Sequence, residues 1–257
     1  MKVNWSPLTR ELAIWRGEGL RLPIWWRDDD AVSGTPALER LGSLAADLGM
    51  PVYVAAVPDN VDATLAPAVE AQPSIIPVVH GWRHLSHAPE GAKNAEFGHP
   101  REGAAEELEQ ALQGLRAVFA DQLVPLFVPP WNRVDESFLP VLQAVGYGGF
   151  STYGARKSTP PTAGLVQINT HIDPIFWRGH RGLVEPDTLI SGLTSTLQFR
   201  RTGEVDPTEP LGLLTHHLVH TEAVWDFSRD VLQVLLDGGG IPADIGALIQ
   251  AGRKPSI

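Results

Sequence analysis

The sequence predicts an α/β protein, a single-domain seven-stranded (β/α) barrel built around a parallel sheet. Short apolar runs alternate with amphipathic helical patterns along most of the chain, which is typical of β-α-β units. Seven such runs are present, and seven parallel strands are enough to curl a sheet into a barrel. The chain of 257 residues is long enough for one large domain. We expect that domain to span residues 1–257, with its core at about residues 20–240.

The apolar runs have the length and composition of strands. We predict strands over Leu22–Trp26, Val52–Val57, Ile75–Val79, Leu123–Val128, Gly148–Thr152, Leu165–Asn169 and Leu211–Thr215. The segments between them carry apolar residues at helical spacing. We predict helices over Pro36–Leu48, Glu102–Phe119, Asp135–Val145, Pro186–Leu197, Thr221–Leu236 and Pro242–Ala251. The first helix has Thr35 before it as an N-cap and a proline at its first position, two signals of a helix start.

The composition excludes several classes of function. The net charge is −10 and the acidic residues are spread along the chain, which argues against nucleic acid or an anionic membrane as the main partner. The chain has no cysteine, so disulfides and thiolate metal ligands are excluded. The first twenty residues contain no apolar signal-type core, and no apolar stretch is long enough to span a bilayer. We therefore expect a cytoplasmic protein that does not bind a membrane.

Polar side chains gather at the carboxyl ends of the predicted strands. These clusters are Arg27–Asp30 after the first strand, His80 after the third, Pro129–Asn132 after the fourth, His171 and Asp173 after the sixth, and His216 and His217 after the seventh. Barrel enzymes place their chemistry on this face, because the carboxyl ends of parallel strands meet at one rim. The pattern indicates an active site at that rim.

Two motifs at this rim indicate a metal. His80 and His84 have the spacing that brings two imidazoles to one side of an ion when they lie on one helical turn. That spacing alone also arises by chance among nine histidines. Asp28, Asp29 and Asp30 place three carboxylates directly after an apolar strand, where they repel one another unless a cation is near. Together the motifs favour a metal site over a solvated loop.

The same residues resemble the polysaccharide deacetylases, the NodB-homology carbohydrate esterases of family four. The similarity runs from about Leu22 to about Leu236. Five segments stand in the places of the family's motifs: Arg27–Ala31 for Thr-Phe-Asp-Asp-Gly, His80–His84 for His-Ser/Thr-x-x-His, Val128–Asn132 for Arg-Pro-Pro-Tyr-Gly, Asp173–Trp177 loosely for Asp-Trp, and Leu214–His216 for Leu-x-His. The resemblance implies a distorted (β/α)7 TIM-like barrel and hydrolysis of an amide, most simply an N-acetyl group on a sugar or oligosaccharide.

The resemblance also implies a role for each matching residue. Asp30, His80 and His84 would bind one divalent ion, zinc above all. Asp29 would be the general base, His216 the general acid, and Asp173 would orient His216 and hold its proton. The resemblance further implies that the substrate pocket is lined by Trp131, Trp177, Leu214, Pro130 and Asn132.

Three departures from the family pattern leave alternatives open. Val128 stands where the family has the arginine that pairs with the base, and Arg27, Arg83 or Arg133 are the candidates to replace it. Asp28 stands where the first motif has Phe, so the base and ligand pair could be Asp28 and Asp29 instead of Asp29 and Asp30. Gly81 replaces the hydroxyl residue of the second motif. His171 and His217 are also candidates, as neighbours of stronger ones.

Two other functions fit the sequence. One is hydrolysis of a small cyclic amide or ureide at the same metal, and the missing secretion signal favours such a small substrate over a cell-wall polymer. The other is a non-catalytic carbohydrate-binding protein. Asp29 and His216 argue against that second alternative, because a binding protein needs neither, whereas the missing arginine argues for it.

Overall fold

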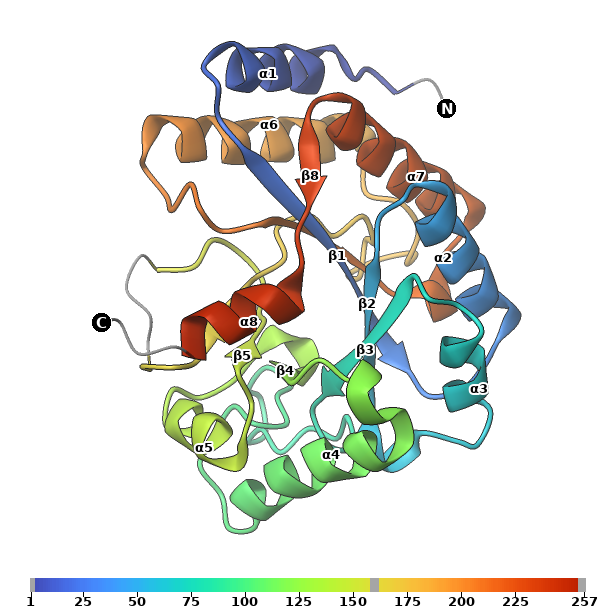
Figure 1. Ribbon diagram of the computed structural model, residues 1–257, viewed down its shortest axis with the longest axis vertical. Coiled ribbons are helices and arrows are strands. Elements are labelled where there is room, and N and C mark those ends of the chain that lie inside the picture. The colour runs from blue at the N-terminus through green and yellow to red at the C-terminus, as the bar shows by residue number, and fades with distance from the viewer. Residues whose placement is uncertain (1–2, 158–161, 254–257) are drawn as a thin grey trace.

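The computed structural model describes residues 3–157 and 162–253, and it has the predicted α/β architecture (Figure 1). Seven parallel strands form a sheet that curls into a half-barrel, in the order β6-β5-β4-β3-β2-β1-β7, and a short β8 pairs with β1 outside this path. The strands are β1 Leu22–Ala31, β2 Val52–Ala56, β3 Ile75–His80, β4 Leu126–Val128, β5 Gly149–Phe150, β6 Val166–Gln167, β7 Leu211–Thr215 and β8 Gly240–Pro242. Because β1 lies between β2 and β7, it is central in the sheet.

Eight helices surround the sheet in the described part of the chain (Figure 1). They are α1 Ser6–Gly17, α2 Pro36–Asp47, α3 Leu65–Glu70, α4 Ala104–Phe119, α5 Phe138–Val145, α6 Pro186–Thr202, α7 Glu222–Asp237 and α8 Ile245–Arg253. The predicted start of α2 is confirmed, since the Thr35 hydroxyl accepts a hydrogen bond from the Leu38 amide at 3.1 Å. Thr221 caps α7 in the same way through the amide of Val224, at 3.4 Å.

Two predicted boundaries near the rim are wrong. The first strand does not end at Trp26 but continues through the three aspartates to Ala31, with an irregular register against β2 between Asp28 and Ala31. Charged residues are accepted in this strand because their charges are paired, Arg27 with Asp29 and Asp28 with His217. The segment from Gly81 to His84 forms no helical turn; it is a loop.

The sequence prediction also missed α1, α3 and β8. α1 packs against α6, where the Trp15 indole donates to the Leu197 carbonyl at 3.3 Å and Arg201 pairs with Glu11 at 2.7 Å. Its partners are almost two hundred residues away in the chain, so no local pattern could show them. None of the described helices is long and apolar enough to cross a membrane.

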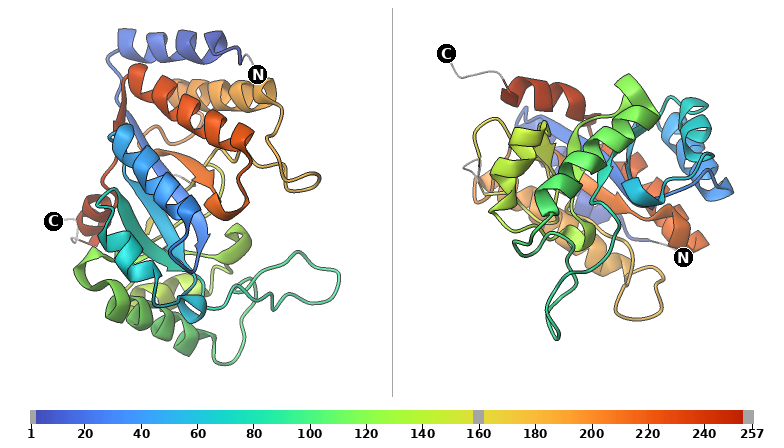
Figure 2. Two further views of the ribbon diagram at one scale, coloured as in Figure 1. Left: turned by 90° about the vertical axis from the view of Figure 1, so that its right-hand side faces the viewer. Right: turned by 90° about the horizontal axis from the view of Figure 1, so that it is seen from below.

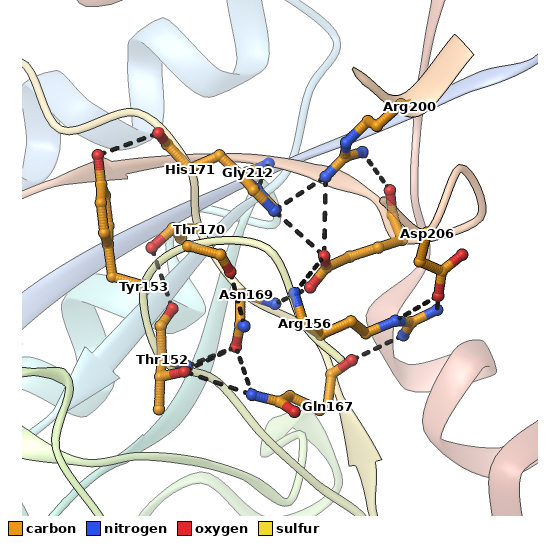
Figure 3. A network of polar contacts seen from close by, with 12 residues as sticks. Thr152, Tyr153, Arg156, Gln167, Asn169, Thr170, His171, Arg200, Asp206 and Gly212 are labelled. Atoms are coloured by element: carbon orange, nitrogen blue, oxygen red, sulfur yellow. Dashed lines mark hydrogen bonds and ion pairs between the residues drawn. The ribbon is translucent and has the colours of Figure 1, made fainter. Parts of the chain in front are cut away.

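A buried polar network joins the open side of the half-barrel. His171 Nε2 lies 3.2 Å from Glu209 Oε2, and the His171 amide donates to the Gly212 carbonyl at 2.7 Å, beside β7. The buried guanidinium of Arg200 lies 3.8 Å from the same carboxylate. Figure 3 shows His171 and Arg200 meeting there, with Arg156 reaching in from the loop after β5. The network holds the segment after β6 against β7, although no regular strand pairing closes the barrel there.

Candidate metal site

Three side chains converge at the rim of the sheet. Asp30 Oδ1 lies 3.1 Å from His80 Nε2 and 3.3 Å from His84 Nε2, and one donor atom from each residue falls within 4.8 Å of the others. Donors around a tetrahedral zinc, with bonds of about 2.0–2.1 Å, lie about 3.3–3.4 Å apart. The spacing and the nitrogen and oxygen chemistry of these donors therefore fit a divalent ion such as zinc. The site is accessible from outside, because the Asp30 side chain is 38% exposed and that of His84 is 28% exposed.

His80 is held for this task by the strand next to it. The ring lies 3.0 Å from the Val128 carbonyl through Nδ1, which places a proton on Nδ1 and directs Nε2 to Asp30, where it would serve as the metal ligand. Burial acts to lower the pKa of His80, but the charges of Asp29 and Asp30 outweigh it and raise the pKa. Burial also acts against the charge of Asp30, yet the hydrogen bond and charge of His80 hold the pKa of that carboxyl well below its usual range. Both shifts show a strong attraction between the carboxylate and the ring.

His84 is placed by the loop that follows β3, and Glu96 anchors this loop. Glu96 is 1% exposed, and its two carboxylate oxygens accept the amides of Trp82 at 3.0 Å and Arg83 at 2.7 Å. Gly81 has a φ of +56°, and a Cβ there would lie 2.1 Å from Glu96 Oε2. Glycine in place of the family's Ser or Thr is thus a requirement of this loop, since any side chain would displace the glutamate.

Arg27 supplies the charge that Val128 cannot. Its Nη2 donates to Asp29 Oδ2 at 3.0 Å, and its Nε lies 2.9 Å from Oδ1 as an ion pair without hydrogen-bond alignment. The guanidinium is fully buried, and it is fixed in turn by Asn132 Oδ1 at 2.6 Å and by the Ser151 hydroxyl at 2.6 Å. Arg27 and Asp29 are two residues apart on one strand, so their side chains share a face. Of the three arginines considered from the sequence, this one contacts the carboxylate.

Oδ1 is the less constrained of the two carboxylate oxygens of Asp29, because Arg27 Nε lies 2.9 Å from it without hydrogen-bond alignment. The residue is 2% exposed, and Oδ1 receives no hydrogen bond from the part of the chain that the structure describes. Buried polar atoms are nearly always hydrogen-bonded, so such an exception requires an explanation. An oxygen in this state, beside the Asp30 cluster, is suited to accept a proton from a water or a substrate group.

Asp28 faces the other side of β1 and does not take part in the cluster. Its oxygens contact the Thr215 hydroxyl at 2.6 Å, the His217 amide at 3.0 Å and His217 Nδ1 at 2.5 Å. Burial acts to lower the pKa of His217, but the charge of Asp28 raises it, and the same pairing lowers the pKa of Asp28 against its own burial. Of the three aspartates, Asp30 contacts the two histidines, and Asp29 pairs with Arg27.

His216, Asp173 and Trp177 meet at the same rim beside β1, because His216 follows Thr215, which pairs with Asp28. No direct hydrogen bond joins Asp173 to His216 within the described residues. Instead, Asp173 Oδ2 accepts the Trp177 indole at 2.8 Å, and the Trp177 ring stands edge-on to His216 with centroids 4.6 Å apart. Burial raises the pKa of Asp173, with Asp29 adding to the rise and His216 opposing it. His216 is thus close enough to influence both Asp173 and Asp30.

The other residues predicted to line the substrate pocket differ in their exposure to solvent. The Trp131 ring lies 4.4 Å from that of His84, and Trp177 is 41% exposed, so both are open to a ligand. Asn132 is half-buried and bound to Arg27. Pro130 is buried, and Leu214 is 1% exposed within β7, so neither presents much surface to a ligand.

Backbone strain marks the same region. Six described residues other than glycine have a positive φ, and four of them are Asp30, His84, Trp131 and Asn132, with φ of 76°, 58°, 57° and 57°. Such conformations cost free energy and gather where function demands them. The long segments after β3 and after β6, which carry His84 and Trp177, extend from the same side of the molecule (Figure 2).

Sequence reasoning missed Glu96 and could only name Arg27 as one of three candidates. Arg27 had a signal, because an arginine two residues before an aspartate in a strand predicts a pair on one face. The predicted strand ends at Trp26 and leaves Arg27 and Asp29 outside it, so this pairing was not predicted. Glu96 had no signal, since it reaches the motif only through the fold of the loop.

The comparisons with known proteins agree with the fold. No sequence-family model matches the chain, and no curated protein matches it at the significance level applied. Among solved structures, a family 4 carbohydrate esterase from Streptomyces lividans in complex with acetate is 14% identical, with a TM-score of 0.54 over 90% of this chain and 95% of that one. A CE4 esterase from Streptococcus mutans is 11% identical, with a TM-score of 0.58 over 87% and 85%.

One of the similar structures is a CE4 family pseudoenzyme from Bacillus anthracis. It is 13% identical, with a TM-score of 0.55 over 89% of this chain and 66% of that one. At these identities the likeness establishes the fold and leaves activity to the site itself. The resemblance seen in the sequence is confirmed at this level: along nearly its whole length, the chain has the fold of the family-four polysaccharide deacetylases.

Proposed function

We propose that this protein is a metal-dependent hydrolase that removes the acetyl group from an N-acetylated sugar or oligosaccharide. The observation that carries the proposal is the pairing of two arrangements at one rim. Asp30, His80 and His84 have the spacing of metal ligands, and the Arg27-bound Asp29 beside them has an oxygen without a hydrogen bond. A metal site alone fits many functions, whereas the second carboxylate supplies a base.

The metal ligands and the base divide the work of amide hydrolysis. A divalent ion held by Asp30, His80 and His84 would polarise the amide carbonyl and lower the pKa of a water. Asp29 accepts the proton of the attacking water at Oδ1. Arg27 fixes the orientation of Asp29, because its Nη2 donates to the other oxygen, Oδ2, at 3.0 Å. Zinc suits the donor set of one carboxylate and two imidazoles.

His216 is the proposed general acid. An amine is a poor leaving group until it is protonated, and His216 directly follows β7, the strand beside β1, at the same rim. Asp173 acts on His216 through Trp177. The Trp177 indole donates a hydrogen bond to Asp173, and its ring packs against His216. Trp131 and Trp177 then flank the site, with faces available to an apolar acetyl group or a sugar ring.

The other two functions predict different results at this site. A hydrolase of small cyclic amides would use the same residues, so only substrate trials separate it from a deacetylase. A non-catalytic binding protein was favoured by the missing arginine at Val128, and Arg27 now fills that place. That observation favours an enzyme over a non-catalytic binding protein.

The decisive experiment measures acetate release by the zinc-loaded protein from N-acetylglucosamine oligomers, with Asp29→Asn as the inactive comparison. Asp47→Asn, an exposed carboxylate at the end of α2, which leads to the amino end of β2 and so lies away from the rim, is the matched control. The proposal requires turnover in wild type and control, and its loss in Asp29→Asn with metal still bound. No acetate from any oligomer, but ring opening of a cyclic ureide, would replace it with the alternative hydrolase.

A second experiment tests the acid. His216→Ala should slow amide hydrolysis by roughly a hundredfold or more, since a lost general acid costs that much. Hydrolysis of an activated aryl ester should fall far less, because a phenolate leaves without a proton. Equal losses on both substrates would remove His216 from the acid role.

A further inference from the structure

A large cavity adjoins the metal site and takes no part in the chemistry described so far. Its volume is about 1070 Å³, at the upper end of the roughly 300–1,000 Å³ typical of small-molecule sites. It lies between the loop after β3, the turn after β4 and the loop after β5. Asn132 and Thr152 belong to its lining, and both contact the guanidinium of Arg27. The cavity therefore shares a wall with the group that holds the base.

One wall of this cavity is polar, uncharged and rigid. Asn169 Oδ1 accepts hydrogen bonds from the Thr152 amide at 2.9 Å, the Thr152 hydroxyl at 3.0 Å and Gln167 Nε2 at 3.3 Å. Figure 3 shows these three side chains gathered in one chain of contacts. A wall of fixed amides and hydroxyls suits the hydroxyl groups of a sugar better than it suits an apolar ligand.

The charges in the lining are opposite to those of the protein as a whole. The chain carries 20 basic and 30 acidic residues. The cavity lining reverses this excess, with the cations Lys93, Arg133, Arg156 and Lys157 against the acids Asp135 and Glu136. Because concave walls concentrate the field of their charges, this local excess attracts an anion.

Two of the four cations are occupied and two are available. Arg156 pairs with Asp206 at 2.8 Å, and Lys157 lies 3.7 Å from Glu136. Arg133 is half-buried, donates one hydrogen bond to the Asn94 carbonyl at 2.6 Å, and forms no ion pair with a carboxylate of the described chain. Lys93 is exposed and likewise forms no ion pair among the described residues. A half-buried guanidinium without a carboxylate is suited to bind an oxyanion.

Arg133 is also close to the reacting centre along the chain. It follows Trp131 by two residues, so their Cα atoms are at most about 8 Å apart. The Trp131 ring contacts the ring of His84. Arg133 therefore follows the same turn that places Trp131 beside His84.

We propose that this cavity binds an oxyanion carried by the substrate, so that the enzyme prefers an N-acetyl sugar bearing a carboxylate or a phosphate over a neutral one. The inference rests on the proposed deacetylase function. Arg133 and Lys93 bind the anion, and the partly exposed side chains of Thr152 and Gln167, which the buried Asn169 holds in place, contact the hydroxyl groups of the same unit.

The test compares three probes on the zinc-loaded protein: a neutral N-acetylglucosamine disaccharide, the same disaccharide with a carboxylate-bearing ether, and the same disaccharide with a phosphate ester. The measured quantity is kcat/KM for each anionic probe divided by that for the neutral one. Wild type should prefer at least one anionic probe, and added salt should reduce that preference. The ranking of the two anionic probes distinguishes a carboxylate from a phosphate.

Variants assign the preference to the cavity. Arg133→Gln and Lys93→Gln should each lower the ratio, Arg133→Gln by roughly tenfold, as expected for a lost hydrogen bond to a charged group. Arg133→Lys should keep part of it. Arg229→Gln, on the exposed face of α7, is the matched control for a lost positive charge. A ratio near one in wild type, or one that Arg133→Gln leaves unchanged, overturns the proposal.

A binding measurement separates this proposal from the proposed function. Calorimetric titration of the metal-free protein with the anionic disaccharides needs no catalysis. Binding that Arg133→Gln weakens, without hydrolysis of any probe, would support the cavity and contradict the deacetylase. Hydrolysis of all three probes at equal kcat/KM would support the deacetylase and contradict the cavity.

Discussion

Two clusters in this protein contain the same kinds of residue and yet differ in what they can do. At the rim, Asp30 meets His80 and His84; on the open side of the half-barrel, Glu209 meets His171 and Arg200. Both clusters combine imidazole with carboxylate at about 3 Å. Residue type and distance alone therefore do not mark a functional site.

The difference lies in which atoms are already satisfied. Both ring nitrogens of His171 are engaged, Nδ1 by the Gly212 amide at 3.1 Å and Nε2 by Glu209 at 3.2 Å. His80 uses Nδ1 on a backbone carbonyl, and its Nε2 points to the same oxygen as His84 Nε2. Donors that converge on one point fit an ion, whereas donors that pair off one by one stabilise the fold.

The largest expected effect is a loss of turnover, and it tests whether Asp29 and Asp30 on β1 have different roles. Asp29→Asn should lower turnover by about 10²–10⁴-fold, because it removes the base, while the protein retains its metal. Asp30→Asn should instead weaken metal binding. Turnover and elemental analysis of both variants decide this, and exchange of the two phenotypes would make Asp30 the base.

Removing a ligand should have a large effect on metal and a small one on folding. His84→Ala should weaken zinc affinity by roughly a hundredfold or more, since loss of a direct ligand should cost at least as much as loss of a supporting partner. The half-exposed position of His84 makes the fold tolerant of the change. Competition with a chelator of known affinity measures the loss. His171→Ala is the comparison from the other cluster and should leave zinc affinity unchanged; equal losses would erase the distinction drawn above.

A smaller effect is expected at Glu96. Glu96→Gln should weaken zinc affinity by about tenfold, because the two backbone amides that fix the loop before His84 bind different oxygens, and Gln places an NH2 donor against one of them. The same chelator competition measures it. Glu90→Gln, exposed on the same loop, removes an equal charge and should have no effect. Zinc affinity equal to that of wild type in Glu96→Gln would show that His84 is held by other contacts.

The smallest effect is a pH dependence of stability from the structural cluster. Burial lowers the pKa of His171, and the charge of Arg200 adds to this against Glu209. The folded state therefore binds a proton less readily than the unfolded chain, so His171 should contribute a loss of stability as the pH falls below about 6.5. Denaturant unfolding of the metal-free protein at pH 7.5 and pH 5.5 should show a smaller pH dependence in His171→Gln than in wild type. An unchanged dependence would place the effect in other histidines, and His99→Gln, on the surface, is the control.

The sequence predicted most of what is local in this fold. The alternation of apolar and amphipathic segments gave the parallel α/β architecture, and β7 was predicted with its observed ends. The strands β5 and β6 were overestimated, because each pairs over only two residues before the chain leaves the sheet. α1 was missed because its stability comes from packing on α6, a partner distant in sequence.

By itself, the sequence determined the candidate metal ligands, because the aspartate run and the two histidines are short motifs at the ends of strands. It left open which aspartate meets the histidines and which arginine replaces the one missing at Val128. Only the tertiary structure decided these. The alternation of side chains along β1 sends Asp28 to His217 and Asp29 to Arg27. The loop fixed by Glu96 brings His84 to Asp30. These contacts join residues whose proximity depends on how strands and loops pack, which no short motif records.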